Sequence, residues 1–423
     1  AYPLVLLDVL REMVTNVEEP TQTQAPLNQL IHDRALATPE LDSLTRPNVD
    51  TLYSQAYLDL GEEPYLLYKP ATERYCSIQP FDGYSNTPAV LGTGGLGGNE
   101  EATYALTGPR FDGTLPDGVV HVPMTTDLVW LLLRIRCYGP DDVSEPHRIQ
   151  DGLDIYPLSQ HGSEHTYPRG THDPASDYVP VERMRAMSAA EYFSRFNQLA
   201  IRNPGAELDR PALERFATLG IGPGLIFDRD ALPEAARERA DTIPGFIGSP
   251  EVNKGRRITT VAGWIYLDRD VGNYGTNYLY RAVVAHRGFA NPVDVTAYPS
   301  TQVDANGDQL VGSTSYRMHF EPGQLPPFLE HGWWSLTAYT IGGRLIPNEV
   351  NRYAIDDSQD LKVNDDGSVD LWISAENPGP ERERNWLPVC SEEFALTLRI
   401  YFPHASVTEH QWTVPQVAPL ASL

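Results

Sequence analysis

The chain has few cysteines, few basic residues and no long apolar run, and each shortage argues against a class of protein. Three cysteines without a Cys-x-x-Cys pair are too few for a disulfide framework; we expect reduced core thiols and leave one bridge open. With 32 basic against 57 acidic side chains, the net charge of -25 disfavours nucleic acid and anionic membrane surfaces as partners. No apolar run approaches the ~20 residues that a membrane-spanning helix needs.

Several nucleotide-binding and nucleophile motifs are also missing. The sequence contains no P-loop, no Gly-x-Gly-x-x-Gly after a strand and no Gly-x-Ser-x-Gly elbow. These absences argue against ATP, dinucleotide and serine-hydrolase chemistry, so no organic cofactor is expected. A divalent metal stays open.

The start of the chain leaves its location open. It begins at Ala1 with no initiator Met and no basic-plus-apolar leader. A soluble protein is expected, and secreted, periplasmic and cytoplasmic locations are all compatible with this start. The 423 residues allow two or three domains, and self-association into a homo-oligomer is also left open.

The strongest pattern lies between residues 313 and 403, where short apolar runs alternate with polar residues. The runs are rich in Tyr, Trp, Val, Leu and Thr, and Gly, Asn, Asp and Pro separate them at intervals typical of an antiparallel sandwich. Gly342-Gly343 and Asp366-Gly367 supply the positive φ that tight hairpins need. This region therefore predicts a β-sandwich or jelly roll.

Helical patterns and a second β unit precede that region. Residues 1–35 begin with a helical pattern, and short strands follow from about 52 to 155. Residues 156–180 have no period and predict a long loop. Ser188 and Glu191 form a capping box that begins a helical block, and Asn277 to His286 predict a further helix.

We therefore expect a mainly β protein with a helical segment. Its parts are an N-terminal helical segment, a β-sandwich-like domain, a helical middle and a C-terminal jelly-roll or β-sandwich domain, at residues 1–50, 51–180, 181–260 and 261–423.

Long strings in both halves of the chain carry a family resemblance. The first half contains RPNVDTLYS (46–54), RYCSIQPFDGYSNTPAVLGTG (74–94) and LVWLLLRIRCYG (128–139). The second half contains GNYGTNYLYRAVVAHRG (272–288), YRMHFEPGQLPP (316–327), WSLTAYT (334–340), NRYAI (351–355), DGSVDLWIS (366–374) and NWLP (385–388). Together they resemble a family of two domains of unknown function, DUF1254 followed by DUF1214. The resemblance implies β-sandwich and jelly-roll domains joined by a helical part.

The chain departs from that family pattern at two places. Members usually carry an Arg shortly after the Gly-Thr that aligns with Gly92-Thr93, whereas this chain reads GTGGLGG. The segment between Pro327 and Trp334 is longer than usual and contains Glu330 and His331. If the missing Arg binds an anionic substrate group elsewhere in the family, this protein lacks it, and both changes are consistent with a different substrate.

Polar side chains cluster at the ends of two predicted strands in the first half. The candidates there are Asn48, Asp50, Tyr53, Asp82, Tyr84 and Asn86. Asp50 and Asp82 offer carboxylates for acid/base catalysis, and Arg134 offers a fixed cation for an oxyanion. The structural alternatives are an Asx-type turn with Arg46 salt-bridged nearby, and an ion pair that keeps Arg134 in its apolar run.

Histidines are the candidates for a proton shuttle or a metal ligand. His319 alternates with Arg317 on one face of a predicted strand. To form a metal site, His32, His286 and His331 would have to converge on it. A hydrogen-bonded structural histidine is the alternative. The string HGSEH (161–165) matches a zinc peptidase motif, but its Gly and Pro neighbours oppose the helix that this motif needs.

Arg352 and Trp386 complete the candidate site. They are expected to line a pocket between the two β domains, with turn or core positions as the alternative. The sequence thus favours a soluble enzyme that acts on a small organic molecule by acid/base or metal-assisted chemistry, as a hydrolase, lyase or isomerase. The catalytic residues would be Asp50, Asp82, Arg134 and His319. The alternative is a non-catalytic protein that binds carbohydrate or another small molecule.

Overall fold

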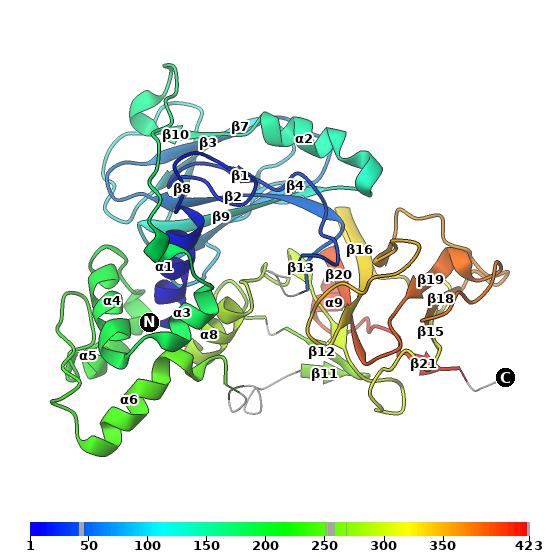
Figure 1. The fold of residues 1–423 in the computed structure, drawn as a ribbon. Helices are drawn as coiled ribbons and strands as arrows, with labels where there is room; N and C mark the ends of the chain where they lie inside the picture. Colours follow the sequence, from blue (N-terminus) through cyan, green and yellow to red (C-terminus); the bar gives the residue numbers. More distant parts are fainter. Residues whose placement is uncertain (42–45, 250–251, 253–258, 268, 421–423) are drawn as a thin grey trace.

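Two β-sandwiches and a group of helices make up the molecule (Figure 1). The structure is a computed structural model and describes residues 1–41, 46–249, 252, 259–267 and 269–420. It is mainly β with several helices, as the sequence predicts. In Figure 1 the first sandwich lies at the top, the helices lie below it and the second sandwich lies at the right.

The first sandwich pairs a six-stranded sheet, in the order β1-β2-β9-β4-β5-β6, with a four-stranded sheet, β10-β3-β7-β8. Leu58, Ile78, Leu131 and Leu133 are among the residues that fill the core between them. The strands are β1 Ile31–His32, β2 Thr51–Asp59, β3 Tyr65–Lys69, β4 Cys76–Asp82, β5 Leu91–Gly92, β6 Leu96–Gly97, β7 Ala102–Thr107, β8 Val120–Pro123, β9 Leu128–Arg136 and β10 Asp154–Pro157.

Strand β9 is buried along its whole length because both of its faces are covered. Leu131 and Leu133 point into the sandwich core, whereas Trp130 and Leu132 pack in the core formed with the helices. Side chains alternate along a strand, so Arg134 continues the face of Trp130 and Leu132. This explains an apolar run with an arginine inside it.

The helices cover that second face. Helix α1 contacts α3, α4 and α8, and residues 2–9 of α1 are all buried, as expected for a helix packed on several sides. Ser188 accepts a hydrogen bond from the backbone N–H of Glu191, which confirms the predicted cap of α4. The helices are α1 Tyr2–Val14, α2 Ser144–Asp151, α3 Pro180–Ala186, α4 Ala189–Arg202, α5 Arg210–Ala217, α6 Glu234–Phe246, α8 Tyr278–His286 and α9 Ala405–Thr408.

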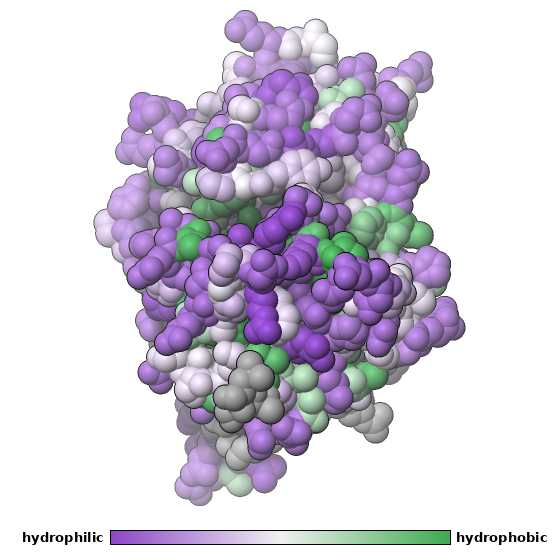
Figure 2. Space-filling view, turned by 90° about the vertical axis from the view of Figure 1, so that its right-hand side faces the viewer, coloured by the Kyte–Doolittle hydropathy of each residue, from purple (hydrophilic) through white to green (hydrophobic). Residues whose placement is uncertain are grey.

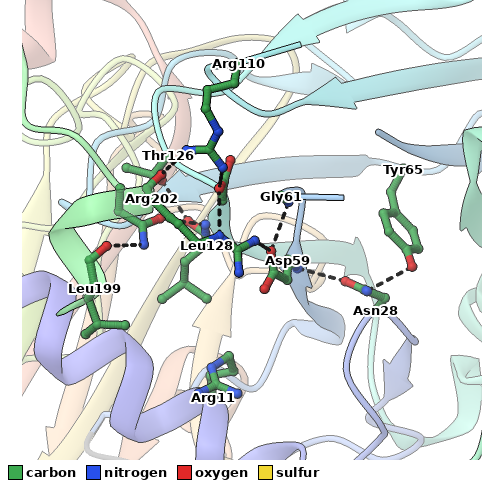
Figure 3. A network of polar contacts seen from close by, with 12 residues as sticks. Arg11, Asn28, Asp59, Gly61, Tyr65, Arg110, Thr126, Leu128, Leu199 and Arg202 are labelled. Atoms are coloured by element: carbon green, nitrogen blue, oxygen red, sulfur yellow. Dashed lines mark hydrogen bonds and ion pairs between the residues drawn. The ribbon is translucent and has the colours of Figure 1, made fainter. Parts of the chain in front are cut away.

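A charged network joins α4 to the first sandwich (Figure 3). Asp127 is buried and pairs with Arg110 and, at 3.2 Å, with Arg202 Nε. Arg202 also pairs with Asp59 on β2. Asn203, at the end of α4, accepts a hydrogen bond from the backbone N–H of Leu128 at 2.8 Å.

The second sandwich confirms the strands predicted between residues 313 and 403. One sheet has the order β11-β12-β14-β20-β16-β17, with β13 also paired to β20, and the other has the order β19-β18-β15-β21. Gly343 and Gly367 have φ of 81° and 86°, as their predicted turns require. The strands are β11 Thr259–Val261, β12 Trp264–Tyr266, β13 Thr296–Ala297, β14 Ser300–Thr301, β15 Tyr316–Phe320, β16 Phe328–Thr340, β17 Ala354–Asp356, β18 Val369–Ser374, β19 Trp386–Pro388, β20 Phe394–Pro403 and β21 Ala418–Pro419.

Residues 158–179 form the predicted loop, interrupted only by two short 3-10 turns, Leu158–Gln160 and Pro174–Ser176. The loop lies on the segment after α1, where Gln29 Nε2 donates to the carbonyl of Pro168 at 2.6 Å. The HGSEH string therefore lies outside any helix.

The face in Figure 2 is mainly hydrophilic, and its apolar residues form small separate groups. None of the helices described here is both long and apolar enough to span a bilayer.

Candidate functional site

A buried carboxylate lies where the two sandwiches meet. Asp50, one residue before β2, accepts three side-chain hydrogen bonds from the second sandwich. Trp333 Nε1 donates to Oδ2 at 3.2 Å, Ser335 Oγ donates to Oδ2 at 2.5 Å, and Tyr401 OH donates to Oδ1 at 3.3 Å. Because an unpaired buried carboxylate is costly, these donors make the position of Asp50 tolerable and fix its orientation.

Asn48 connects the backbone at this point to the same tyrosine. Its Oδ1 accepts a hydrogen bond from the N–H of Asp50 at 2.9 Å, which is the Asx-type turn considered from the sequence. Its Nδ2 donates to Tyr401 OH at 2.5 Å and to Thr51 Oγ1 at 2.9 Å. Asn48 therefore holds Asp50 and Tyr401 in a fixed relation.

Two buried guanidinium groups lie in the same interface. Arg134 Nη1 donates to Gln79 Oε1 and, at 2.8 Å, to Asn291 Oδ1. Arg399 donates to Thr337 Oγ1 at 3.3 Å and to the carbonyl of Arg46 at 2.9 Å. Within the described part of the chain, neither guanidinium lies within 4.0 Å of a carboxylate. The structural alternative for Arg134, an ion pair, is thus replaced there by contacts with neutral amides.

Tyrosines surround these guanidinium groups. The ring centroid of Tyr53 lies 5.5 Å from the Arg134 guanidinium. Burial lowers the pKa of Arg134, but the nearby phenols of Tyr53 and Tyr298 outweigh this effect and the pKa rises. Burial also lowers the pKa of Arg399, and Tyr339 and Tyr401 are among the groups that reverse the shift. Both arginines therefore stay charged.

Tyr401 is the link between the carboxylate and the arginines. Burial, followed by the neighbouring Asp50 carboxylate, raises the pKa of Tyr401 well above its usual value, so the phenol keeps its proton. Its ring stacks on Trp333 with centroids 3.7 Å apart, and Tyr75 from the first sandwich meets Trp333 edge-on at 4.6 Å. We call Asp50, Tyr401, Trp333, Ser335, Arg134 and Arg399 the interface cluster.

Asp82, Tyr84 and Asn86 form a separate turn. The Asp82 carboxylate accepts hydrogen bonds from Asn86 Nδ2 at 2.8 Å, from Thr125 Oγ1 at 2.6 Å and from two backbone N–H groups. Tyr84 OH donates to the carbonyl of Asn203. None of these described contacts reaches the interface cluster, so Asp82 closes its own turn.

The remaining predicted residues also lie apart from the interface cluster in their described contacts. His319 Nδ1 and Asp370 Oδ1 are 2.7 Å apart on the four-stranded sheet of the second sandwich. Arg352 donates to the carbonyl of Trp386 at 3.0 Å. His32 Nδ1 lies 2.7 Å from Ser54 Oγ, and burial lowers its pKa to about 4. His331 lies 3.8 Å from Glu330. Of the four predicted catalytic residues, Asp50 and Arg134 both lie near Tyr401, but no described hydrogen bond or ion pair joins the two to each other.

Among the described residues, no group of three or more His, Cys, Asp or Glu side chains could hold a metal ion. The two histidines of HGSEH lie around Tyr156, with His165 Nδ1 2.6 Å from Asp154 Oδ2.

Sequence reasoning missed Tyr401, Trp333, Ser335 and Arg399. The alternation of side chains along a strand could have predicted part of this set. Arg399 and Tyr401 share one face of β20, and they pair with Ser335 and Trp333 on β16. Polar residues on a face of a buried central strand indicate that something polar covers that face.

The fold and this site define a two-domain β protein with a polar interface between its sandwiches. The DUF1254 family model, described as a protein of unknown function, matches residues 27–157, and the DUF1214 model, with the same description, matches residues 295–405. The chain belongs to this two-domain DUF1254–DUF1214 family, as its sequence strings indicate.

One solved structure shares the fold. The crystal structure of the VPA0106 protein from Vibrio parahaemolyticus matches with a TM-score of 0.72 and 20% identity, covering 99% of this chain and 97% of that one. An uncharacterised protein from Burkholderia cenocepacia matches with a TM-score of 0.49 and 12% identity, covering 99% of this chain and 87% of that one. No curated protein matches the chain.

Proposed function

We propose that this protein is an enzyme that acts on a small organic molecule by acid/base chemistry at the interface cluster. One observation carries the proposal: a buried tyrosine–carboxylate pair, Tyr401 and Asp50, lies in the same interface as guanidinium groups without a described carboxylate partner. A base, a neutral acid and fixed cations are the parts that general acid/base catalysis needs.

Asp50 serves as the base in this proposal. It takes a proton from the substrate while the bonding electron pair stays on the substrate, and the Tyr401 hydroxyl donates a hydrogen bond to the oxygen where negative charge develops. Returning the proton to another atom gives an isomerase, and loss of a leaving group gives a lyase. In a hydrolase the proton would come from an attacking water.

Arg134 binds an anionic group of the substrate. A buried guanidinium pays a desolvation cost that neutral amides only partly offset, so a substrate carboxylate or phosphate would supply the missing countercharge. Asp82 and His319 have no part in this proposal, because their described hydrogen bonds lie in other parts of the fold.

The test is turnover by purified variants. A panel of small carboxylic acids, esters and hydroxy acids would be followed by NMR, and Asp50→Asn should lower kcat for the active compound by about 10²–10⁴. Tyr401→Phe should lower kcat as well, whereas Arg134→Gln should mainly raise KM. Asp370→Asn is the control, because that carboxylate pairs with His319 on the four-stranded sheet. If folded Asp50→Asn turned over the active compound as fast as the wild type, the proposal would be contradicted.

Metal analysis decides between two forms of the chemistry. The proposal needs no organic cofactor and assigns no step to a metal. A stoichiometric transition metal in the purified protein would favour the metal-assisted form, with His32, His319 and His331 as the histidines to mutate first.

A non-catalytic small-molecule-binding protein is the second proposal. Three protein donors already occupy the Asp50 carboxylate, which favours a fixed structural acceptor over a base. Carbohydrate is the less favoured ligand, because Trp333, Trp334 and Trp386 are buried and offer no open stacking surface.

A further inference from the structure

A cavity of about 170 Å³ is lined by residues of β11, β12, β13 and α9 and of the segments next to them. A cavity of about this volume holds a molecule the size of benzene. Arg269, Tyr298 and His410 are among the lining residues with polar groups.

The lining combines an apolar wall with a few polar groups, as ligand sites do. Leu267, Val293, Ala297 and Val407 supply the apolar wall. The Arg269 side chain is 62% exposed, so the cavity is reached from solvent on that side. A ring-sized ligand would thus bury its body on the apolar wall and keep its charged group at Arg269.

Arg269 is free to accept a new anion. The carboxylate of Glu409 lies 3.9 Å away and is itself 45% exposed, so this ion pair is loose and contributes little to stability. An incoming carboxylate can form two parallel hydrogen bonds with a guanidinium, which an exposed pair at this distance does not have.

His410 adds a second, independent observation. Its backbone has φ of 57°, which is unfavourable for a residue other than glycine. Its Nδ1 is buried and has no hydrogen-bond partner among the described residues, while its ring meets Tyr266 edge-on at 4.8 Å. Strain and an unsatisfied nitrogen at one residue both cost stability, and such residues gather at ligand sites.

Tyr298 connects the cavity to the interface cluster. It lines the cavity, and its phenol is close enough to Arg134 for that guanidinium to act on it. A ligand in the cavity would therefore lie one tyrosine away from the buried arginine.

We propose that this cavity binds a small organic acid with a ring-sized apolar body, its carboxylate held by Arg269 beside His410. The inference goes beyond the proposed function. None of Asp50, Tyr401 and Arg134 lines this cavity, so it is a second ligand site whose binding does not depend on catalysis at the interface cluster.

The test is calorimetric titration of the full chain with benzoate, and with benzyl alcohol as a neutral probe of similar size. Benzoate should bind saturably and benzyl alcohol at least tenfold more weakly. Arg269→Gln should weaken benzoate binding about tenfold, since one charge-assisted contact is lost. Arg317→Gln is the matched control, an exposed arginine of the same domain whose carboxylate partner lies 3.7 Å away.

Two filling variants test the cavity itself. Ala297→Leu and Val293→Phe add carbon atoms at the wall, and each should abolish benzoate binding; the second covers the case that the first fails to fold. Absence of saturable binding, equal binding of benzyl alcohol, or full binding in Arg269→Gln would each overturn the inference.

Asp50→Asn separates this inference from the proposed function. It removes the proposed base and leaves the cavity lining unchanged, so benzoate binding should be retained. If Asp50→Asn still binds benzoate, the cavity site is supported, whatever the turnover of this variant. If Asp50→Asn has unchanged turnover, only the proposed function is overturned.

Discussion

Gly94 lies directly against the ring of Phe402, at the contact between the two sandwiches. A Cβ added at Gly94 would lie 2.2 Å from Phe402 Cζ, closer than real side-chain contacts come. Gly94 also has φ of 74°, in the left-handed region that favours glycine. This glycine stands in the GTGGLGG run (92–98), so the run has a steric role in how the two domains meet.

Gly94→Ala should therefore destabilise the protein by roughly 2–4 kcal/mol, from the left-handed backbone cost plus the clash with Phe402. Gly98→Ala is the matched control, because Gly98 has φ of 51° but nothing within 4 Å of its added Cβ. It should cost about 1 kcal/mol. Urea unfolding of both variants measures the difference, and equal losses would show that Phe402 moves aside freely.

Arg110 and Arg202 should behave as substitutes for one another at Asp127. Both side chains are about half exposed, so Arg110→Ala or Arg202→Ala alone should cost about 1 kcal/mol or less. The double variant leaves the buried carboxylate without a cation and should cost about 3 kcal/mol. A double-mutant cycle in urea measures this coupling.

The control for that cycle is the Asp127→Asn background. An amide at this position carries no charge to be left unpaired, so the coupling between the two arginine substitutions should fall close to zero. A coupling that survives there would assign the effect to the other partner of Arg202, Asp59.

Local features of the fold could be predicted because their causes are local. Alternation along residues 394–402 predicts β20, the Ser188 hydroxyl predicts the start of α4, and Gly343 and Gly367 predict turns with positive φ. Each depends on a few neighbouring residues, whose backbone preferences act in the same direction as the final packing.

The site was less predictable because it depends on how the two sandwiches meet. Asp50 and Asp82 look alike in sequence, each a carboxylate at a strand end. One is held by Trp333 and Ser335 from the other sandwich, the other mainly by its own turn. Trp333 and Ser335 lie 283 and 285 positions after Asp50 in the sequence, so no local sequence pattern predicts these contacts.

Lys69 is a buried lysine whose role is structural. It is fully buried at the end of β3, and its ammonium donates to the carbonyls of Glu100 at 2.8 Å and Pro70 at 3.0 Å. Lys69→Met should cost about 2 kcal/mol, because these carbonyls lose a charged donor. Lys362→Met is the control, since Lys362 pairs with Glu381 at the surface; its unfolding midpoint should hardly move. Equal midpoints in both variants would show that water replaces the Lys69 ammonium.

His32 should make stability fall as the pH is lowered. Burial holds its pKa at about 4 in the folded chain, below the ~6.5 of an unfolded histidine. Between these values the unfolded chain binds a proton that the folded chain does not, so the contribution of His32 is complete above pH 6.5 and is lost as the pH falls toward 4.

His32→Gln tests this, because glutamine does not titrate and can still bond Ser54 Oγ. Between pH 7.5 and pH 5.0 the variant should lose about 2 kcal/mol less stability than the wild type, because about 1.5 pH units of that range lie below the unfolded pKa. The neighbouring Asp33 has a pKa raised by burial to about 6, which acts in the opposite direction as the pH falls. Asp33 is present in both proteins, so the difference between their urea unfolding curves isolates the effect of His32. If both proteins lost the same stability between the two pH values, His32 would bind its proton equally well in the folded and unfolded chains.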